Sequence, residues 1–163
     1  MNSKRILVTG ATGFLGSRLL ERLAEDKTMT VTATGRSLKT HNRIDAPNVR
    51  YVLGDLTEDS FVDGLVQGQD AIVHAAALSS PWGSKRAFWA SNVRPTELLV
   101  RAAETHGVER LVLISTPSMY FQMTSQRDLK EEDPLPKPIN QYAASKREAE
   151  RMVEASDIPH VIL

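Results

Sequence analysis

Residues 6–16, which read ILVTGATGFLG, decide the fold of this 163-residue chain. A short apolar strand runs into a tight turn and then into the start of an amphipathic helix. Gly10 permits the turn, Gly13 lets backbone N–H groups approach a phosphate, and Gly16 lets the helix pack closely on its strand. The positive end of the helix dipole then faces an anion. The stretch predicts a seat for the pyrophosphate of a dinucleotide, although such turns also serve as plain strand–helix connectors.

Short apolar strands alternate with amphipathic helices along the rest of the chain. We predict strands at residues 5–9, 30–34, 49–53, 70–74, 110–115 and 160–163, and helices at 14–25, 60–66, 84–106 and 140–156. Pro95 is expected to kink or split the third helix near Ser91 and Asn92, because its ring lacks an N–H and crowds an earlier carbonyl. The alternation predicts an α/β fold of the Rossmann type, a doubly wound parallel sheet with helices on both faces. Residues 122–137 lack any period and are predicted to form a long surface loop.

Composition excludes several functional classes. Twenty basic residues balance twenty acidic ones, so the net charge favours neither nucleic acid nor an anionic membrane as a partner. The absence of cysteine excludes disulfides and thiolate metal sites, and it fits a cytoplasmic location. The four histidines are far apart in sequence, and no apolar run is long enough for a signal core or a membrane span. We therefore expect no metal, and a small molecule as the partner.

Further motifs support the glycine turn. Residues 54–56 (GDL) follow the third predicted strand, residues 74–77 (HAAA) follow the fourth, and residues 142–146 (YAASK) open the last helix. Together with residues 9–16 and 92–93, these motifs resemble the extended short-chain dehydrogenase/reductase superfamily, the NAD-dependent epimerase/dehydratase group, over essentially the whole chain. Members of that superfamily carry a C-terminal substrate domain.

The chain stops inside an apolar strand at Leu163. Natural domains seldom end there. We therefore interpret residues 1–163 as an NAD(P)-binding Rossmann domain, a fragment of a longer chain that lacks the substrate domain. A complete small domain with an edge strand at its terminus is the alternative.

The resemblance implies a set of cofactor contacts. Asp55 would hydrogen-bond the adenine, the backbone after the fourth strand would line the cofactor, and Lys146 would hold the nicotinamide ribose. The expected cofactor-binding residues are Gly10, Thr12, Gly13, Phe14, Leu15, Gly16, Arg36, Asp55, Leu56, Ala75, Ala76, Ala77, Tyr142 and Lys146.

The end of the second strand bears on the choice of dinucleotide. A Rossmann site that prefers NAD places a carboxylate there, which accepts hydrogen bonds from the ribose. Residues 33–37 (ATGRS) contain no carboxylate but do contain Arg36. A guanidinium can pair with the 2′-phosphate of NADP. NADP is therefore the favoured cofactor and NAD the alternative, since Arg36 could also stack on the adenine of NAD or stand exposed in a loop.

Tyr142 and Lys146 are four residues apart in the last predicted helix, so both side chains lie on one face. A free tyrosine titrates near ~10, and a lysine ammonium beside it, together with the positive nicotinamide ring, favours the phenolate. Tyr142 would then exchange the proton of a substrate hydroxyl or carbonyl while hydride moves to or from the nicotinamide.

The resemblance adds two further catalytic candidates. A serine or threonine at the end of the fifth strand would hydrogen-bond the reacting oxygen. The aligned residue is Thr116, with Ser115 and Ser118 as rivals. Asn92 resembles the asparagine that shapes the middle helix and supports the lysine, although a plain structural role beside Pro95 also explains it.

The resemblance leaves several reactions open. The superfamily's sugar dehydratases follow the threonine with an acidic pair, where this chain has Pro117-Ser118, so dehydration is disfavoured. Residues 74–77, 82–83 and 115–121 resemble the 3β-hydroxysteroid dehydrogenase-like branch, although Phe121 stands where sugar epimerases usually carry glycine. We predict an NAD(P)-dependent oxidoreductase acting on a secondary alcohol or ketone. The alternatives are a nucleotide-sugar epimerase and a non-catalytic NADP-binding sensor. A homodimer through the middle and last helices is implied by the resemblance.

Overall fold

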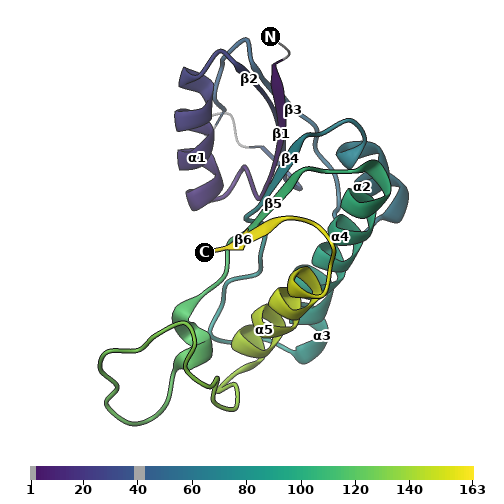
Figure 1. Ribbon diagram of the computed structural model, residues 1–163. Helices are drawn as coiled ribbons and strands as arrows, with labels where there is room; N and C mark the ends of the chain where they lie inside the picture. The colour runs from purple at the N-terminus through teal and green to yellow at the C-terminus, as the bar shows by residue number, and fades with distance from the viewer. Residues whose placement is uncertain (1–2, 39–42) are drawn as a thin grey trace.

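Six parallel strands form one sheet in the order β3-β2-β1-β4-β5-β6 (Figure 1). This computed structural model describes residues 3–38 and 43–163. The strands are β1 (Lys4–Thr9), β2 (Met29–Thr34), β3 (Val49–Tyr51), β4 (Ala71–His74), β5 (Arg110–Leu113) and β6 (His160–Ile162). The helices are α1 (Phe14–Glu25), α2 (Asp59–Val66), α3 (Lys85–Phe88), α4 (Arg94–His106) and α5 (Gln141–Glu154). The strand order reverses between β1 and β4, which confirms the predicted doubly wound Rossmann-type fold.

Different helices cover the two faces of the sheet (Figure 1). Helix α1 lies on one face, and α2, α4 and α5 lie on the other. Neighbouring residues of β1 show the division, because Leu7 packs in the core cluster that contains the apolar side chains of α2, α4 and α5. Val8 packs in the cluster that contains Leu20 of α1. Both faces are therefore buried, which explains the continuous apolar runs in the central strands β1 and β4.

The middle helix is interrupted where Pro95 predicts it. A π-helical turn, η2 (Trp89–Val93), joins α3 to α4, and the N–H of Arg94 bonds to the carbonyl of Trp89, five residues back. Pro95 lies in the first turn of α4 and has no N–H to give to the carbonyl of Ser91. The wider turn holds one more residue than an α-helical turn, and Asn92 within it is buried.

Two of the predicted strands are longer than the observed ones. The third strand ends at Tyr51 rather than residue 53, although the N–H of Gly54 still bonds to the carbonyl of Gly35 at 3.1 Å. The fifth ends at Leu113 rather than residue 115 and leads to a 3-10 turn, η3 (Pro117–Tyr120). Residues 122–137 contain no helix or strand, and Figure 1 shows this segment projecting from the rest of the domain.

Two further observations concern the described residues, 3–38 and 43–163. None of their helices combines the length and the apolarity that crossing a bilayer requires. Among the same residues, no cluster of three or more histidine, aspartate or glutamate side chains could hold a metal ion.

Candidate active site

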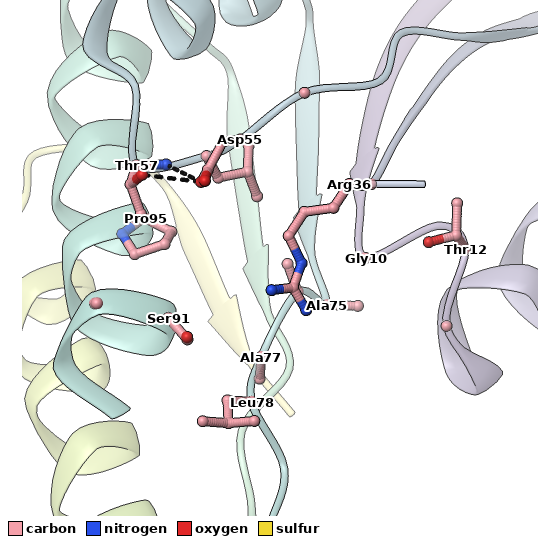
Figure 2. Close-up of a pocket in the computed structure, with 16 residues that line it drawn as sticks. Gly10, Thr12, Arg36, Asp55, Thr57, Ala75, Ala77, Leu78, Ser91 and Pro95 are labelled. Carbon is pink, nitrogen blue, oxygen red and sulfur yellow. Dashed lines mark hydrogen bonds between the residues drawn. The ribbon is translucent and has the colours of Figure 1, made fainter. Parts of the chain in front are cut away.

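A pocket of about 490 Å³ opens at the carboxyl ends of the central strands (Figure 2). It lies where the strand order reverses, which is where ligands bind in open α/β sheets. Its volume is in the range of small-molecule sites. The predicted cofactor-binding residues that line it are Gly10, Thr12, Gly13, Arg36, Asp55, Leu56, Ala75, Ala76 and Ala77.

The glycine turn forms one wall of the pocket. Gly10 has a φ of 67°, and a side chain there would lie 2.6 Å from the backbone nitrogen of Ala76. Gly16 packs so tightly that a Cβ would collide with the carbonyl of Gly10. Only glycine fits either position.

Helix α1 begins at the pocket without a cap of its own. Its N-cap residue is Gly13, which has no side chain to cap the helix, and the described residues place no acidic side chain in the first turn. The side chains of Phe14 and Leu15 are exposed, so the backbone N–H groups of this turn are what the helix presents. Unsatisfied N–H groups at the positive end of a helix form an anion site, and a pyrophosphate fits that chemistry.

Arg36 and Asp55 supply the charges of the pocket. Figure 2 shows the Arg36 side chain projecting between the glycine turn and the segment that carries Asp55 and Thr57. One carboxylate oxygen of Asp55 accepts hydrogen bonds from the N–H and the hydroxyl of Thr57, each at 2.9 Å. These bonds hold the pKa of Asp55 below its usual value, and the Arg36 cation adds to the effect. Asp55 is therefore an ionised acceptor at neutral pH.

Tyr142 and Lys146 lie on α5, outside the lining of this pocket. Asn140 caps that helix by accepting the N–H of Ala143 at 2.8 Å. The Tyr142 ring packs against Phe88, with the ring centroids 6.2 Å apart. The Lys146 side chain is buried, and its ammonium donates to the carbonyl of Ile114, just beyond β5, at 2.6 Å.

Burial sets the charge state of Lys146. The residue is only 3% exposed. Desolvation of the ammonium lowers its pKa from 10.5 to about 8, and the nearby carboxylate of Glu150 opposes this shift. At pH 7 Lys146 therefore still carries a positive charge, held inside the protein one helical turn after Tyr142.

Thr116 and Asn92 also lie outside the pocket lining. The Thr116 hydroxyl accepts from the N–H of Ser118 at 3.2 Å and donates to the Ser118 hydroxyl at 3.0 Å. Asn92 bonds to the backbone of Leu78 and to the hydroxyl of Ser145. Its hydrogen bonds thus reach the residue before Lys146 rather than Lys146 itself.

Sequence reasoning missed seven residues that line the pocket. Four lie beside predicted ones at strand ends, so position alone could have identified them. The other three come from the π-helical turn and the start of α4, and their signal was Pro95, which the sequence presents only as a helix breaker. The missed residues are Gly35, Gly54, Thr57, Leu78, Ala90, Ser91 and Pro95.

Comparison with known proteins places this arrangement in context. Residues 6–160 match the NAD dependent epimerase/dehydratase family. The chain is similar to 2-alkyl-3-oxoalkanoate reductase of Shewanella oneidensis, with 34% identity over 148 residues, which cover 90% of this chain and 37% of the reductase.

Two solved structures are similar in fold. One is the enzyme WbmH of Bordetella bronchiseptica in complex with NAD+, with a TM-score of 0.88 and 25% identity, covering 98% of this chain and 55% of that one. The other is UDP-glucuronic acid 4-epimerase of Bacillus cereus in complex with UDP-glucuronic acid and NAD. Its TM-score is 0.82 and its identity 26%, covering 97% of this chain and 55% of that one. The chain therefore spans between 37% and 55% of the length of these three proteins.

Proposed function

Because this chain belongs to the NAD dependent epimerase/dehydratase family, we propose that it is the cofactor-binding part of an NAD(P)-dependent oxidoreductase that acts on a secondary alcohol or ketone. The observation that carries this proposal is the buried cation of Lys146, one helical turn after Tyr142. The helix that bears them is bonded through Ser145 to Asn92, and Asn92 adjoins Ser91 of the pocket lining. This connection supports our proposal that the pocket binds the dinucleotide and that Tyr142 and Lys146 transfer the proton in the same site.

Residues of three segments would hold the dinucleotide. The N–H groups at the start of α1 would bind its pyrophosphate, because they have no side-chain cap and the N-cap residue Gly13 lines the pocket. The ionised Asp55 would accept from the adenine, and the small side chains of residues 75–77 would admit the ligand closely. When bound, the nicotinamide supplies or takes up the hydride.

Tyr142 and Lys146 would move the proton. The buried Lys146 cation stabilises negative charge developing on the phenolic oxygen of Tyr142, so that Tyr142 can take or give the proton of the substrate's oxygen. One of the hydroxyls of Ser115, Thr116 and Ser118 would hydrogen-bond that oxygen. Each of these roles is a proposal drawn from position and chemistry.

The direct test is Tyr142→Phe in the full-length protein, screened against secondary alcohols and their ketones. General acid–base catalysis contributes about 10²–10⁴-fold, so turnover should fall by that factor while dinucleotide affinity stays within about threefold of wild type. Turnover that survives the substitution would contradict this mechanism. A wild-type protein that binds dinucleotide and turns nothing over would favour the non-catalytic sensor.

A nucleotide-sugar epimerase is the second candidate, and the likeness to an epimerase crystallised with UDP-glucuronic acid favours it. The two reactions differ in the fate of the hydride. An epimerase returns it to the same sugar, so reduced dinucleotide does not accumulate, whereas a dehydrogenase releases reduced dinucleotide in step with product.

We further propose that the cofactor is NADP. Arg36 projects into the pocket from the end of β2, where no carboxylate stands to accept from the ribose hydroxyls of NAD. Its guanidinium suits a 2′-phosphate. The homodimer and the cytoplasmic location stay predictions, which sedimentation equilibrium and cell fractionation would check.

A further inference from the structure

His74 is a buried titratable side chain for which the proposed reaction has no role. It ends β4 and is 2% exposed. Its Nδ1 lies 2.7 Å from the hydroxyl of Thr9 at the end of β1, and its Nε2 lies 3.1 Å from the hydroxyl of Thr96 on α4. The ring therefore bridges the central strands and the middle helix.

The partners of the two threonines fix the direction of both bonds. The Thr96 hydroxyl gives its single hydrogen to the carbonyl of Asn92 at 2.7 Å, so it can only accept from Nε2–H of His74. The Thr9 hydroxyl accepts the N–H of Ala76 at 3.2 Å, which leaves its own hydrogen for Nδ1 of His74. The position of each hydrogen is then fixed in a series of hydrogen bonds that runs from Ala76 through Thr9, His74 and Thr96 to Asn92.

The ring must be neutral for this order to hold. Burial, together with a smaller effect of the Lys146 cation, lowers the pKa of His74 from 6.5 to about 3. A neutral imidazole with its hydrogen on Nε2 is an acceptor on one side and a donor on the other. It thus satisfies both threonines at once.

The two ends of this series of hydrogen bonds lie near the two parts of the candidate site, the pocket and helix α5. Ala76 lines the dinucleotide pocket. Asn92 lies in the π-helical turn, where its side chain accepts the N–H of Leu78 at 2.7 Å and donates to the hydroxyl of Ser145 at 2.9 Å. Ser145 in turn donates to the carbonyl of Tyr142 at 2.7 Å. A path of hydrogen bonds, which passes from the backbone carbonyl to the side chain of Asn92, therefore joins the pocket wall to the helix that carries Tyr142 and Lys146.

We propose that His74 is a positioning residue that fixes the pocket wall at Ala76 relative to the helix bearing Tyr142 and Lys146. The inference rests on the proposed function, since it is there that these two parts bind the dinucleotide and move the proton. The His74 ring sits between β1 and α4 and acts through the path just described. A side chain at position 74 that could bond to only one of the two threonines would leave the other buried hydroxyl without a partner.

The first arm of the test needs neither cofactor nor substrate. The ¹⁵N resonances of the His74 ring, measured by NMR from pH 5 to pH 8, should report a hydrogen on Nε2 and none on Nδ1 throughout. A hydrogen on Nδ1, or protonation of the ring within that range, would overturn the proposal.

The second arm separates positioning from stability. His74→Asn keeps an acceptor for Thr9, His74→Gln keeps a donor for Thr96, and Thr96→Val removes a hydroxyl without changing shape. Thr32→Val is the matched control, because Thr32 is 2% exposed against 1% for Thr96, lies in the same domain and takes no part in the path.

In the full-length protein, each of the three variants on the path should lower kcat for hydride transfer at least tenfold, with the dinucleotide Kd within about threefold of wild type. Thr32→Val should lower the unfolding midpoint by a similar amount and leave kcat unchanged. Equal kcat in all four variants would reduce His74 to a structural role and overturn the proposal. A wild-type protein without hydride transfer would contradict the proposed function instead, and the tautomer measurement would still decide the hydrogen-bond chain.

Discussion

Arg36 and Asp55 place opposite charges in the lining of one pocket, where we propose that a dinucleotide binds. Asp55 commits one carboxylate oxygen to Thr57 and keeps the other available as an acceptor. The guanidinium of Arg36 projects into the same space from the end of β2. At this scale the sequence predicted both residues from their positions after the second and third strands, and both line the pocket.

Arg36→Ala tests the choice of cofactor. Removing the guanidinium deletes a charge-assisted contact with the 2′-phosphate, worth roughly 1.5–3 kcal/mol, so the NADP/NAD affinity ratio should fall by about tenfold or more. Calorimetric titration with both dinucleotides measures the ratio. Arg43→Ala is the control, since Arg43 belongs to the same connection between β2 and β3 but does not line the pocket. An unchanged ratio in Arg36→Ala would show that the preference for NADP is wrong.

Lys146 predicts a pH dependence of stability whose sign follows from its lowered pKa. The pKa is about 8 in the folded protein and 10.5 ordinarily, so between pH 8 and pH 10 the unfolded chain binds more protons than the native one. The free energy of unfolding should therefore rise with pH there, by at most about 1.4 kcal/mol per unit from this residue.

Urea unfolding of wild type and Lys146→Met at pH 7, 8, 9 and 10 isolates this contribution, since every other group titrates in both proteins. The difference in unfolding free energy should shift in favour of wild type as the pH rises. Parallel curves would mean that Lys146 titrates normally.

At the scale of elements, the π-helical turn is the feature that joins the pocket to α5. It brings the side chain of Asn92 into hydrogen bonds with Leu78 and Ser145. Pro95 predicted that the helix would break here, but a break does not specify which residues turn inward. Which residues turn inward depends on the extra residue in the π-helical turn, and the spacing of apolar residues in the sequence does not reveal that residue.

Asn92→Ala should destabilise the protein and weaken the site together. The substitution leaves the half-buried backbone of Leu78 and the buried hydroxyl of Ser145 without their partner, each costing about 1–3 kcal/mol, so a loss of about 2–6 kcal/mol in the free energy of unfolding is expected. Dinucleotide affinity should also fall severalfold, because Leu78 lines the pocket.

Asn48→Ala is the matched control for that experiment. The Asn48 amide donates to three carbonyls, those of Leu23, Asp26 and Met29, away from the pocket lining. It should lower stability comparably and leave affinity unchanged. Equal affinity losses in the two variants would refute a specific role for the π-helical turn.

At the scale of the whole molecule, the parallel sheet brings distant segments to one edge. The pocket is lined by segments that run from Gly10 to Pro95, because all the strands end on the same side. The alternation of strands and helices and the glycine turn were sufficient to predict this fold, since both are local signals. The bond from Asn92 to Ser145 joins residues 53 apart, so it arises from tertiary packing and left no trace in the sequence pattern.

The central claim is that a dinucleotide pyrophosphate binds at the start of α1. The pair Gly13→Asp and Gly13→Asn tests it most directly, because both side chains cap a helix equally well and differ only in charge. A carboxylate there stabilises the helix by about 0.3–1 kcal/mol through its interaction with the helix dipole, but it repels a phosphate.

The deciding measurement is calorimetric titration of NADP into wild type and the two Gly13 variants. We predict that Gly13→Asp unfolds at the same or higher urea concentration than Gly13→Asn but binds NADP at least tenfold more weakly. Equal NADP affinities in the two variants would contradict the account.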